Sequence, residues 1–401
     1  MSKAETIICT VGTSLLESNL KSLPDTEDNF HKLLAGRYKK DSDYLQSRWK
    51  EVQETKNLYL NNQDQKLGQF LASFPDDLML NGAEINSIGC LLKRKDVDLR
   101  RLIFLVSDTL SGLRMGEILK AYYMARQKEL GLKFVDYQTV KGMQDEHPGS
   151  FRAQGLRNLV REIGKIIYES GGAEKMAINA TGGYKAQIAV AVLIGQALDM
   201  PVYYKHERFN DIISFPPMPV SLDYSLVGRY GDLLSAFERG CVLSSDEIGQ
   251  DIEKIRPLLE EVEIDGQLYW ELGAIGQIYL TGYRLRNPKP PYLKELTDES
   301  RKLPTLSNHG YGGKRDDFKD FVNRVWREFR WIKTCVSAGY HSQSSIRKTG
   351  FRIECEGNGK QEIIGEWKDD KIGLRFKVIT TAQHEADLIW AVDQLNQRFG
   401  E

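Results

Sequence analysis

The stretch Ile178-Asn179-Ala180-Thr181-Gly182-Gly183-Tyr184-Lys185 decides how the first half of this chain folds. An apolar run, Met176–Ile178, leads into it, and a run of small residues with helical character, Ala186–Leu198, follows it. A strand that passes through a polar glycine turn into a helix gathers backbone N–H groups at the helix N-terminus. The Thr181 hydroxyl and the Lys185 ammonium lie in the same turn. The sequence therefore predicts a site for an anion or a polar ligand edge.

Two further turns of this kind precede it. Thr6–Val11 reads as a buried strand, and Gly12-Thr13-Ser14 follows as a tight turn in which Gly12 permits close backbone approach and Thr13 or Ser14 caps a helix. Arg101–Val106 reads as a second buried strand, which ends in Ser107-Asp108-Thr109. Each turn therefore follows the carboxyl end of a predicted strand.

Strands alternate with helices through the first 215 residues. Such alternation, with continuous apolar strands, predicts an α/β domain with a mostly parallel sheet covered on both faces. The remaining predicted elements are strands at Leu132–Val140, Pro201–Tyr204 and Ile212–Phe215, and helices at Gly82–Leu92, Gly112–Leu130 and Gly155–Glu169. Ligands bind such sheets beyond the carboxyl ends of the strands, so we expect the three turns to meet on one rim.

The amino-acid composition limits which classes of protein this chain can belong to. The 401 residues are 41% hydrophobic and 28% charged, which is enough for more than one core. We expect a cytoplasmic protein without a membrane segment, because no run reaches the length of a membrane span and Met1–Glu5 does not read as a signal peptide. The five scattered cysteines contain no C-x-x-C pair, which argues against disulfides and zinc.

The formal net charge of −1 conceals an asymmetry. Residues 231–287 carry five Lys and Arg against eleven Asp and Glu, whereas residues 324–377 carry twelve against seven. We therefore expect any polyanionic partner at the end of the chain. Proline-rich stretches place boundaries after the first domain and before the last one, which predicts domains at 1–224, 225–289 and 290–401.

The paired turns support a family resemblance. Val11–Leu16 together with Asn179–Lys185 resembles the CARF domain, the Rossmann-like sensor of CRISPR systems, over about residues 1–220, and Gly82–Asn86 is similar to its Csm-type members. The resemblance implies a homodimer that binds a cyclic oligoadenylate on its two-fold axis, with cyclic tetra-adenylate expected ahead of hexa-adenylate. The implied binding residues are Gly12, Thr13, Ser14, Asp108, Thr109, Asn179, Thr181, Gly182, Gly183 and Lys185.

Simpler interpretations stay open. Taken alone, Gly12–Ser14 is better explained as a turn with a helix cap, whereas two such turns on one rim favour a ligand site. Asp108 and Thr109 fit an Asx turn as well as a ligand contact. Some CARF domains also cleave their ligand, and Ser14 with Lys185 would suit that reaction, but the sequence does not separate binding from cleavage.

The middle segment, 225–289, is expected to be mainly helical and acidic, with a hairpin near Asp265-Gly266. It reads either as a winged-helix module or as a plain connector. A DNA-binding winged helix needs a basic recognition helix, and the acidity of this segment counts against one.

The C-terminal pattern is a helix at Asp316–Val336, strands at Phe351–Cys355, Gln361–Trp367 and Gly373–Ile379, and a closing helix at Ala382–Phe399. This small α+β unit with an antiparallel sheet resembles the RelE family of mRNA interferases in element order. The resemblance implies metal-free mRNA cleavage on the ribosome, by attack of a ribose 2′-hydroxyl on the adjoining phosphate. Two other nuclease classes fit less well. The HEPN class needs an Arg-to-His spacing that none of the six histidines provides. The metal-dependent class needs a Glu-x-Lys motif and a preceding Asp, and this sequence has Glu366-x-Lys368 without a convincing partner Asp.

Such a reaction needs cations around the phosphate and a group that moves protons. Arg352, Arg375 and Lys377 alternate with apolar residues, so they share one face of the sheet and are predicted to stabilise the transition state. His384 is the predicted proton-transfer group, and His341 and Lys348 are secondary candidates. A solvated strand face and a helix cap explain the same residues equally well, and the general base is not identified.

Together these features predict a CARF–RelE fusion: a ribosome-dependent mRNA endonuclease of type III CRISPR defence, activated by cyclic oligoadenylate and needing no cofactor or metal. Its partners are the activator, mRNA, a second copy of the chain and the ribosome, which we expect to dock through a ribosomal protein on residues 225–289. Two rivals stay open: a ring nuclease that degrades cyclic oligoadenylate, and a ligand-gated transcription regulator.

Overall fold

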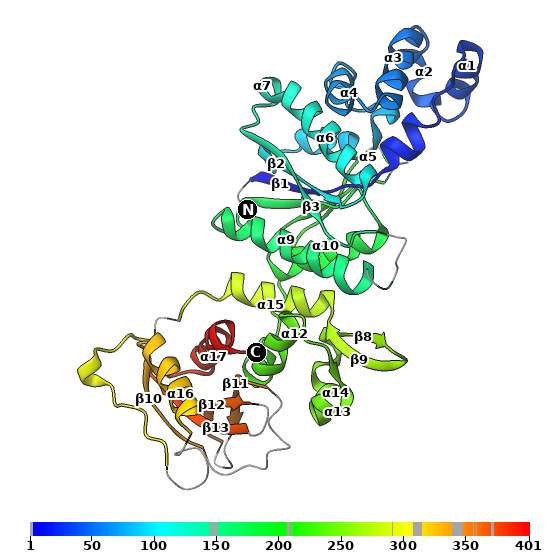
Figure 1. The fold of residues 1–401 in the computed structure, drawn as a ribbon. Coiled ribbons are helices and arrows are strands. Elements are labelled where there is room, and N and C mark those ends of the chain that lie inside the picture. Colours follow the sequence, from blue (N-terminus) through cyan, green and yellow to red (C-terminus); the bar gives the residue numbers. More distant parts are fainter. Residues whose placement is uncertain are drawn as a thin grey trace. The chain divides into compact units, whose positions relative to one another are not determined.

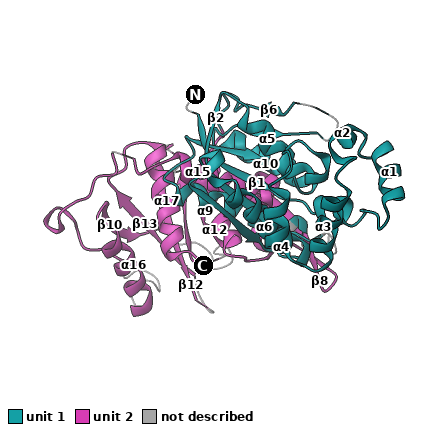
Figure 2. Cartoon of the chain, turned by 90° about the horizontal axis from the view of Figure 1, so that it is seen from above, with its two compact units in different colours: residues 1–221 teal, residues 222–401 magenta. Residues whose placement is uncertain are grey.

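A computed structural model of the chain describes residues 3–144, 149, 151–206, 209, 211–290, 292–307, 315–338, 348–355, 357, 359–369 and 373–401. It divides into two compact units, unit 1 (Met1–Ser221) and unit 2 (Leu222–Glu401), which Figure 2 shows in separate colours. Unit 1 contains a mostly parallel sheet, and unit 2 contains two separate antiparallel sheets. No helix in the described ranges is long and apolar enough to cross a membrane.

Unit 1 is built on a six-stranded sheet with the order β3-β2-β1-β4-β5-β6. Parallel pairing runs from β3 to β5, and β6 closes the edge antiparallel to β5. These strands confirm the predicted mostly parallel α/β domain. Their bounds are β1 (Ala4–Thr10), β2 (Val97–Ser107), β3 (Phe134–Val140), β4 (Met176–Asn179), β5 (Val202–Tyr204) and β6 (Ile213–Phe215).

Helices cover both faces of this sheet (Figure 1). On one face, α4, α5 and α6 enclose the main core with the inward side chains of β1 and β2, such as Ile7 and Phe104. On the other face lie α9 and α10. The helices of unit 1 are η1 (Leu15–Leu20), α1 (Glu27–Ala35), α2 (Ser42–Leu45), α3 (Trp49–Leu60), α4 (Asp64–Leu71), α5 (Gly82–Leu92), α6 (Leu110–Ala125), α7 (Gln127–Leu130), α9 (Leu156–Glu169) and α10 (Lys185–Ala197), with short turns η2 (Lys39–Asp41), η3 (Met79–Asn81) and η4 (Phe151–Gly155).

Unit 2 begins with residues 225–289, whose order of elements fits the winged-helix alternative, and we call them the winged-helix segment. Helices precede a short strand, two further helical turns follow, and a two-stranded hairpin closes a sheet of order β7-β9-β8. The predicted hairpin is confirmed: Asp265 and Gly266 both have positive φ, as the tight turn between β8 and β9 requires. The elements are α11 (Ser225–Arg229), α12 (Gly231–Glu238), β7 (Leu243–Ser244), α13 (Ser245–Ile248), η5 (Gly249–Asp251), α14 (Ile252–Ile255), η6 (Arg256–Leu258), β8 (Leu259–Ile264), β9 (Gln267–Leu272) and α15 (Ala274–Arg286).

The rest of unit 2 is an antiparallel sheet of order β10-β13-β12-β11. Its apolar face, with Phe351 and Phe376, shares one core with α16 and α17 and with winged-helix residues such as Phe237. Residues 225–289 and 290–401 therefore fold together, and a functional division between them stays a prediction. The elements are η7 (Asp298–Ser300), α16 (Asp316–Glu328), β10 (Ile332–Ser337), β11 (Gly350–Cys355), β12 (Gln361–Lys368), β13 (Gly373–Thr380) and α17 (Glu385–Phe399).

The predicted helix at Asp316–Val336 is wrong at its end. Helix α16 stops at Glu328, and Ile332–Ser337 forms strand β10, which pairs with β13. The helical spacing of buried Phe318, Phe321, Val322 and Val325 is not continued beyond the helix, and β-branched residues follow. Such residues favour a strand when a partner strand is available.

Candidate functional site

The two glycine turns of unit 1 lie where the strand order of the sheet reverses. From central β1 the chain moves outward to β2 and β3, and it then returns to β4 on the other side of β1. Gly12–Ser14 follows β1 and Thr181–Lys185 follows β4, so both turns lie at the carboxyl ends of adjacent strands. This switch point is the standard ligand-binding position in open α/β sheets.

The turns touch through their glycines. A side chain on Gly12 would place its Cβ 2.8 Å from the backbone nitrogen of Gly183. A Cβ on Gly182 would lie 2.7 Å from the carbonyl oxygen of Thr10 and 2.9 Å from the nitrogen of Gly12. Gly183 has φ near +97°, which side chains disfavour. The predicted convergence of these two turns is therefore confirmed, and it explains why glycine occupies each position.

A buried carboxyl joins the turns from below. Glu84, in the first turn of α5, is 2% exposed, and its Oε1 accepts a hydrogen bond of 2.8 Å from the Gly12 N–H. Burial raises the pKa of Glu84 above its ordinary value, against the lowering effect of the hydrogen bonds from Gly12 and its own backbone. Sequence reasoning noted Gly82–Asn86 but missed this role. The available signal was an acid inside an otherwise apolar helix turn.

Two predicted ligand residues, Asn179 and Thr181, form hydrogen bonds within unit 1. Asn179 is 1% exposed, and its Nδ2 donates to the Ser87 hydroxyl at 2.8 Å. Its Oδ1 accepts from the Thr181 hydroxyl at 2.6 Å, and that hydroxyl accepts from the backbone N–H of Lys205 at 3.0 Å. These bonds fix the β4 turn against α5 and the end of β5. Direct ligand contact by Asn179 therefore stays a prediction without geometric support.

Other predicted residues remain accessible on the rim. Lys185 is the first residue of the thirteen-residue helix α10 and is exposed, and within the described ranges its ammonium makes no hydrogen bond or ion pair. Ser14 and Gly183 are exposed, and Thr13 is half-buried. An unengaged cation beside a helix N-terminus favours an anion at this point.

The third turn, after β2, is engaged with its own surroundings. The Thr109 hydroxyl caps α6 by accepting the Gly112 N–H at 3.1 Å, as a helix cap does. Asp108 accepts the Gly142 N–H through Oδ2 at 3.2 Å and thereby ties the end of β2 to the loop after β3. The capping interpretation accounts for Thr109, and a ligand contact by Asp108 stays a prediction.

In unit 2 the structure brings Arg352 and Arg375 together, and three carboxylates surround them. Arg352 lies 2.9 Å from Asp232, 2.8 Å from Glu354 and 2.6 Å from Glu366. Arg375 pairs with Glu354, and its Nε lies 3.0 Å from Glu366. We call these five residues the arginine–carboxylate cluster. The sequence missed the carboxylates because β12 and α12 supply two of them from other parts of the chain.

The cluster corrects the expectation of a basic sheet face. Three carboxylates outnumber two guanidinium groups, and Glu366 is only 1% exposed. Burial raises the pKa of Glu354, but the charges of Arg352 and Arg375 outweigh it, so this pKa lies below its ordinary value. A phosphate that enters must therefore compete with Glu354 for the arginines.

The other two predicted catalytic residues are not part of this cluster, although Lys377 is two residues from Arg375 on β13 and shares its face of the sheet. Lys377 pairs with Glu362. His384 precedes α17, where its backbone N–H donates to Asp387 Oδ2 at 2.9 Å and its ring lies 5.0 Å from that of Tyr292. Arg375 and Thr380 are five positions apart on β13, a distance of about 16 Å, so His384, which follows this strand, is at its other end.

The secondary candidates add little to the cluster. Lys348 donates to the Cys241 sulfur at 2.8 Å, and His341 lies outside the described residues. A cavity of about 500 Å³ opens beside the arginines instead, lined by Arg229, Tyr230, Asp232, Asp251, Arg352, Ile353, Glu354 and Cys355. Both the winged-helix elements and β11 therefore border the opening.

Comparison with known proteins bears on unit 1. Residues 79–218 match the model of a CRISPR-associated protein family, Cas_APE2256. The matched stretch begins just before α5 and contains both Glu84 and the β4 turn, whereas Gly12 and all of unit 2 lie outside it.

One solved structure is also similar to this chain: Can2 from Sulfobacillus thermosulfidooxidans in complex with cyclic tetra-adenylate. The sequences are 9% identical, the alignment covers 94% of this chain and 74% of that one, and the TM-score is 0.22.

Proposed function

We propose that unit 1 binds a cyclic oligoadenylate at the switch point between β1 and β4, and that this ligand activates RNA cleavage by unit 2 in CRISPR-linked antiviral defence. The observation that carries the proposal is the direct contact of the Gly12 and Gly182–Gly183 turns, near the Lys185 ammonium, which makes no hydrogen bond or ion pair with any described residue. The match of residues 79–218 to a CRISPR-associated family supports it.

The chemistry of this rim suits such a ligand. A cyclic oligoadenylate repeats a phosphate and a ribose hydroxyl around a ring. Phosphates accept hydrogen bonds from backbone N–H groups and from an ammonium, and Ser14 and Thr13 offer short hydroxyls beside them. A ring with rotational symmetry fits a symmetric pair of such sites, so we propose a homodimer with the ligand on its axis. Cyclic tetra-adenylate is the ring to test first.

For unit 2 we propose metal-independent RNA cleavage at the arginine–carboxylate cluster. The incoming phosphate would replace Glu354 on Arg352 and Arg375, whose guanidinium groups would then stabilise the charge of the crowded phosphorane. Glu354, once released from the arginines, loses the charges that lower its pKa and becomes a better proton acceptor for the attacking 2′-hydroxyl. This assigns the general base that the sequence leaves open, in place of His384.

Glu354 is more exposed than its neighbour Glu366. The Glu354 side chain keeps 38% of its area exposed, whereas that of Glu366 keeps 1%. The buried Glu366 carboxylate forms ion pairs with both arginines. We therefore propose that Glu366 and Asp232 orient the arginines and that Glu354 moves.

The winged-helix segment is proposed as a docking element for a ribosomal protein rather than for DNA. Exposed acids such as Asp246, Glu247 and Glu253 surround its short helices, and Glu263 lies in its wing. Such a surface repels the phosphates of DNA. The test is a variant that lacks residues 243–272 and still folds. If this variant retains full ribosome-dependent cleavage, the docking proposal is wrong.

The decisive experiment offers mRNA to the full chain with and without translating ribosomes, each with and without cyclic tetra-adenylate or hexa-adenylate. We expect cleavage only with ribosomes and one of the rings. Cleavage that ignores both additions would refute the gated model. A chelator arm with purified 30–40 nucleotide RNA, free of ribosomes, tests whether any residual cutting depends on metal.

Matched variants divide the activity between the units. Glu354→Gln should abolish cleavage and leave ring binding intact, whereas Lys185→Ala should weaken ring binding and raise the ring concentration needed for cleavage. Lys360→Ala, an exposed change just before β12, is the control for unit 2. Analysis of the ring after incubation decides the ring-nuclease alternative, and retention on DNA at physiological salt would favour a transcription regulator.

A further inference from the structure

The carboxyl of Glu84 lies beneath the two turns that the proposed activator covers. Its Oε1 accepts the Gly12 N–H at 2.8 Å, and Gly182 approaches the same oxygen so closely that a Cβ there would overlap it. Its Oε2 is buried and makes no hydrogen bond with any described residue. A polar oxygen that is buried without a partner is rare in folded proteins and calls for an explanation.

The first turn of α5 braces both turns, and not the β1 turn alone. Ser87, three residues after Glu84, donates to the Glu84 carbonyl at 3.0 Å and accepts from Asn179 at 2.8 Å. Thr10 completes the frame, because its hydroxyl donates to the carbonyl of Gly182 at 2.6 Å. Side chains of α5 and β1 thus fix the backbone of both turns on the side away from the proposed ligand, and Glu84 contacts both turns.

An ionised carboxylate at this position would oppose the proposed ligand. A negative charge that is buried without an ion pair is costly, and phosphate bound over the turns would add repulsion in a medium of low dielectric constant. A neutral carboxyl avoids both costs and still accepts the Gly12 hydrogen bond through its carbonyl oxygen. In agreement, burial raises the pKa of Glu84.

No charged or titratable neighbour among the described residues would stabilise an ionised Glu84 carboxylate. Cys9 of β1 has a thiol whose pKa is raised far above its ordinary value by burial, so this thiol is neutral. The β4 turn contributes Lys185, which is exposed at the start of α10 and pairs with no described group. The groups that hydrogen-bond to the carboxyl are the backbone N–H of Gly12 and that of Glu84 itself, and neither carries a charge.

We propose that Glu84 is a positioning residue of the activator site that works as the neutral acid, holding the Gly12 turn in place without a negative charge beneath the bound phosphate. The proposal rests on the proposed function, since it takes the activator to be anionic. It adds a proton to the binding reaction: above the pKa of Glu84, binding of the ring takes up one proton per site, and affinity falls as pH rises.

Calorimetric titration of the full chain with cyclic tetra-adenylate tests this. Each titration is run at one pH in two buffers with different ionisation enthalpies, over a series of pH values. We expect proton uptake by the natural protein to rise with pH, and its affinity to fall by up to tenfold per pH unit above the pKa of Glu84. Glu84→Gln mimics the neutral acid, so it should bind with little dependence on pH and without this proton uptake.

Two further variants separate positioning from structure. Glu84→Ala removes the acceptor of the Gly12 N–H and should lower affinity about tenfold or more, and the recovery of affinity in Glu84→Gln shows that the hydrogen bond and not the charge matters. Glu17→Gln removes an exposed carboxylate from the neighbouring helix η1 and should leave the proton uptake in place. Equal proton uptake by the natural protein and Glu84→Gln would overturn the proposal and leave the proposed function standing.

A measurement without ligand keeps the two proposals apart. A group whose pKa is raised on folding costs stability as pH rises through that value, so Glu84→Gln should gain stability relative to the natural protein between acid and neutral pH. A stability difference that does not change with pH would overturn the neutral-acid assignment. If neither cyclic tetra-adenylate nor cyclic hexa-adenylate binds, the proposed function fails, and the unfolding comparison still decides the state of Glu84.

Discussion

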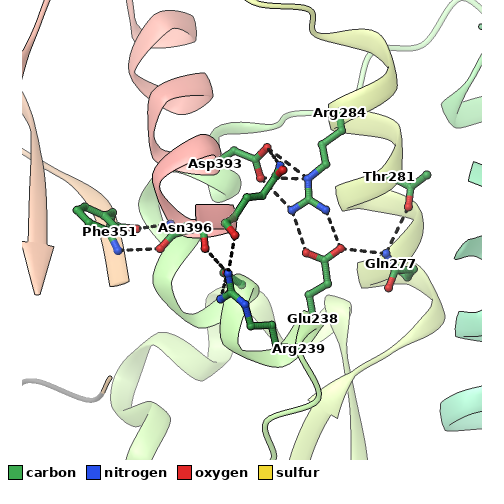
Figure 3. A network of polar contacts seen from close by, with 10 residues as sticks. Glu238, Arg239, Gln277, Thr281, Arg284, Phe351, Asp393 and Asn396 are labelled. Atoms are coloured by element: carbon green, nitrogen blue, oxygen red, sulfur yellow. Dashed lines mark hydrogen bonds and ion pairs between the residues drawn. The ribbon is translucent and has the colours of Figure 1, made fainter. Parts of the chain in front are cut away.

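The side-chain amide of Asn396, on α17, forms two hydrogen bonds with the backbone of Phe351 on β11 (Figure 3). Its Oδ1 accepts the Phe351 N–H at 2.8 Å, and its Nδ2 donates to the Phe351 carbonyl at 2.7 Å. β11 is the edge strand of the sheet, so this amide supplies the pairing that a further strand would supply. Arg239 of α12 in turn donates to the backbone carbonyl of Asn396.

Replacing this amide should destabilise unit 2. Asn396→Ala leaves the Phe351 N–H and C=O buried without partners, so we expect the free energy of unfolding to fall by about 2–4 kcal/mol. Five of the six tryptophans lie after residue 221, so tryptophan fluorescence during urea unfolding follows this unit. Gln394→Ala, on the same helix, should change the midpoint little. Equal midpoints for the two variants would contradict the pairing role.

Arg284 of α15 should be the most sensitive single position of unit 2. It lies 2.7 Å from Glu238 on α12 and 3.0 Å from Asp393 on α17, so one guanidinium joins three helices (Figure 3). Burial lowers the pKa of Arg284, but the two carboxylates outweigh this and keep it charged. Arg284→Met leaves the buried carboxylate of Asp393 and the half-buried one of Glu238 without their cation, and we expect a loss of about 3–5 kcal/mol at neutral pH in urea unfolding.

The pH dependence of this variant has a definite sign. Without the guanidinium, burial and mutual repulsion oppose the ionisation of both carboxyls in the folded state, so stability is lost as pH rises and they ionise. The defect of Arg284→Met should therefore be smaller at pH 5 than at pH 7.5. Adding Glu238→Gln and Asp393→Asn should recover part of the loss at neutral pH, and no recovery would show that repulsion is not its cause.

The contact between the glycine turns of unit 1 should not tolerate a methyl group. Gly182→Ala places its Cβ against Glu84, Thr10 and Gly12 at once, with backbone atoms among them, so the turn must shift. We expect a loss of about 1–3 kcal/mol in unit 1 and loss of detectable cyclic oligoadenylate binding. Gly36→Ala is the matched control, because the nearest atom to its Cβ is 3.6 Å away. Normal ring binding by Gly182→Ala would refute this prediction.

The sequence was informative where chemistry is local. The strand–turn–helix pattern around Gly182 and the apolar strand before Gly12 predict their elements closely, and the parallel topology then brings the two turns together. The hairpin at Asp265-Gly266 is equally local, since a two-residue turn with positive φ at both positions favours Gly and Asp.

The sequence was uninformative where distant segments meet. The network of Asn179 depends on Ser87, 92 positions earlier, and the pairing of Arg352 depends on Asp232, 120 positions earlier. Alternation along β11 and β13 correctly places their arginines on one face, but it cannot show which carboxylates neutralise them. Periodicity also cannot distinguish the end of α16 from the start of β10, because both present apolar residues to the same core.

Lys185 offers the cleanest test of the anion site, because its removal should leave the fold intact. It is exposed and makes no hydrogen bond or ion pair with any described residue, so Lys185→Ala should unfold at the same urea concentration as the natural protein. A charge-assisted hydrogen bond to phosphate contributes about 1.5–3 kcal/mol, so cyclic tetra-adenylate binding should weaken about 10- to 100-fold. The salt dependence of ring binding should also decrease, since one cation per site no longer contacts the ring.

The control is Lys165→Ala, which removes an exposed lysine from α9 and should change neither the affinity for the ring nor the salt dependence of that affinity. If the two variants lose affinity equally, the attraction comes from the overall charge of unit 1, and the helix N-terminus at Lys185 is not the anion site.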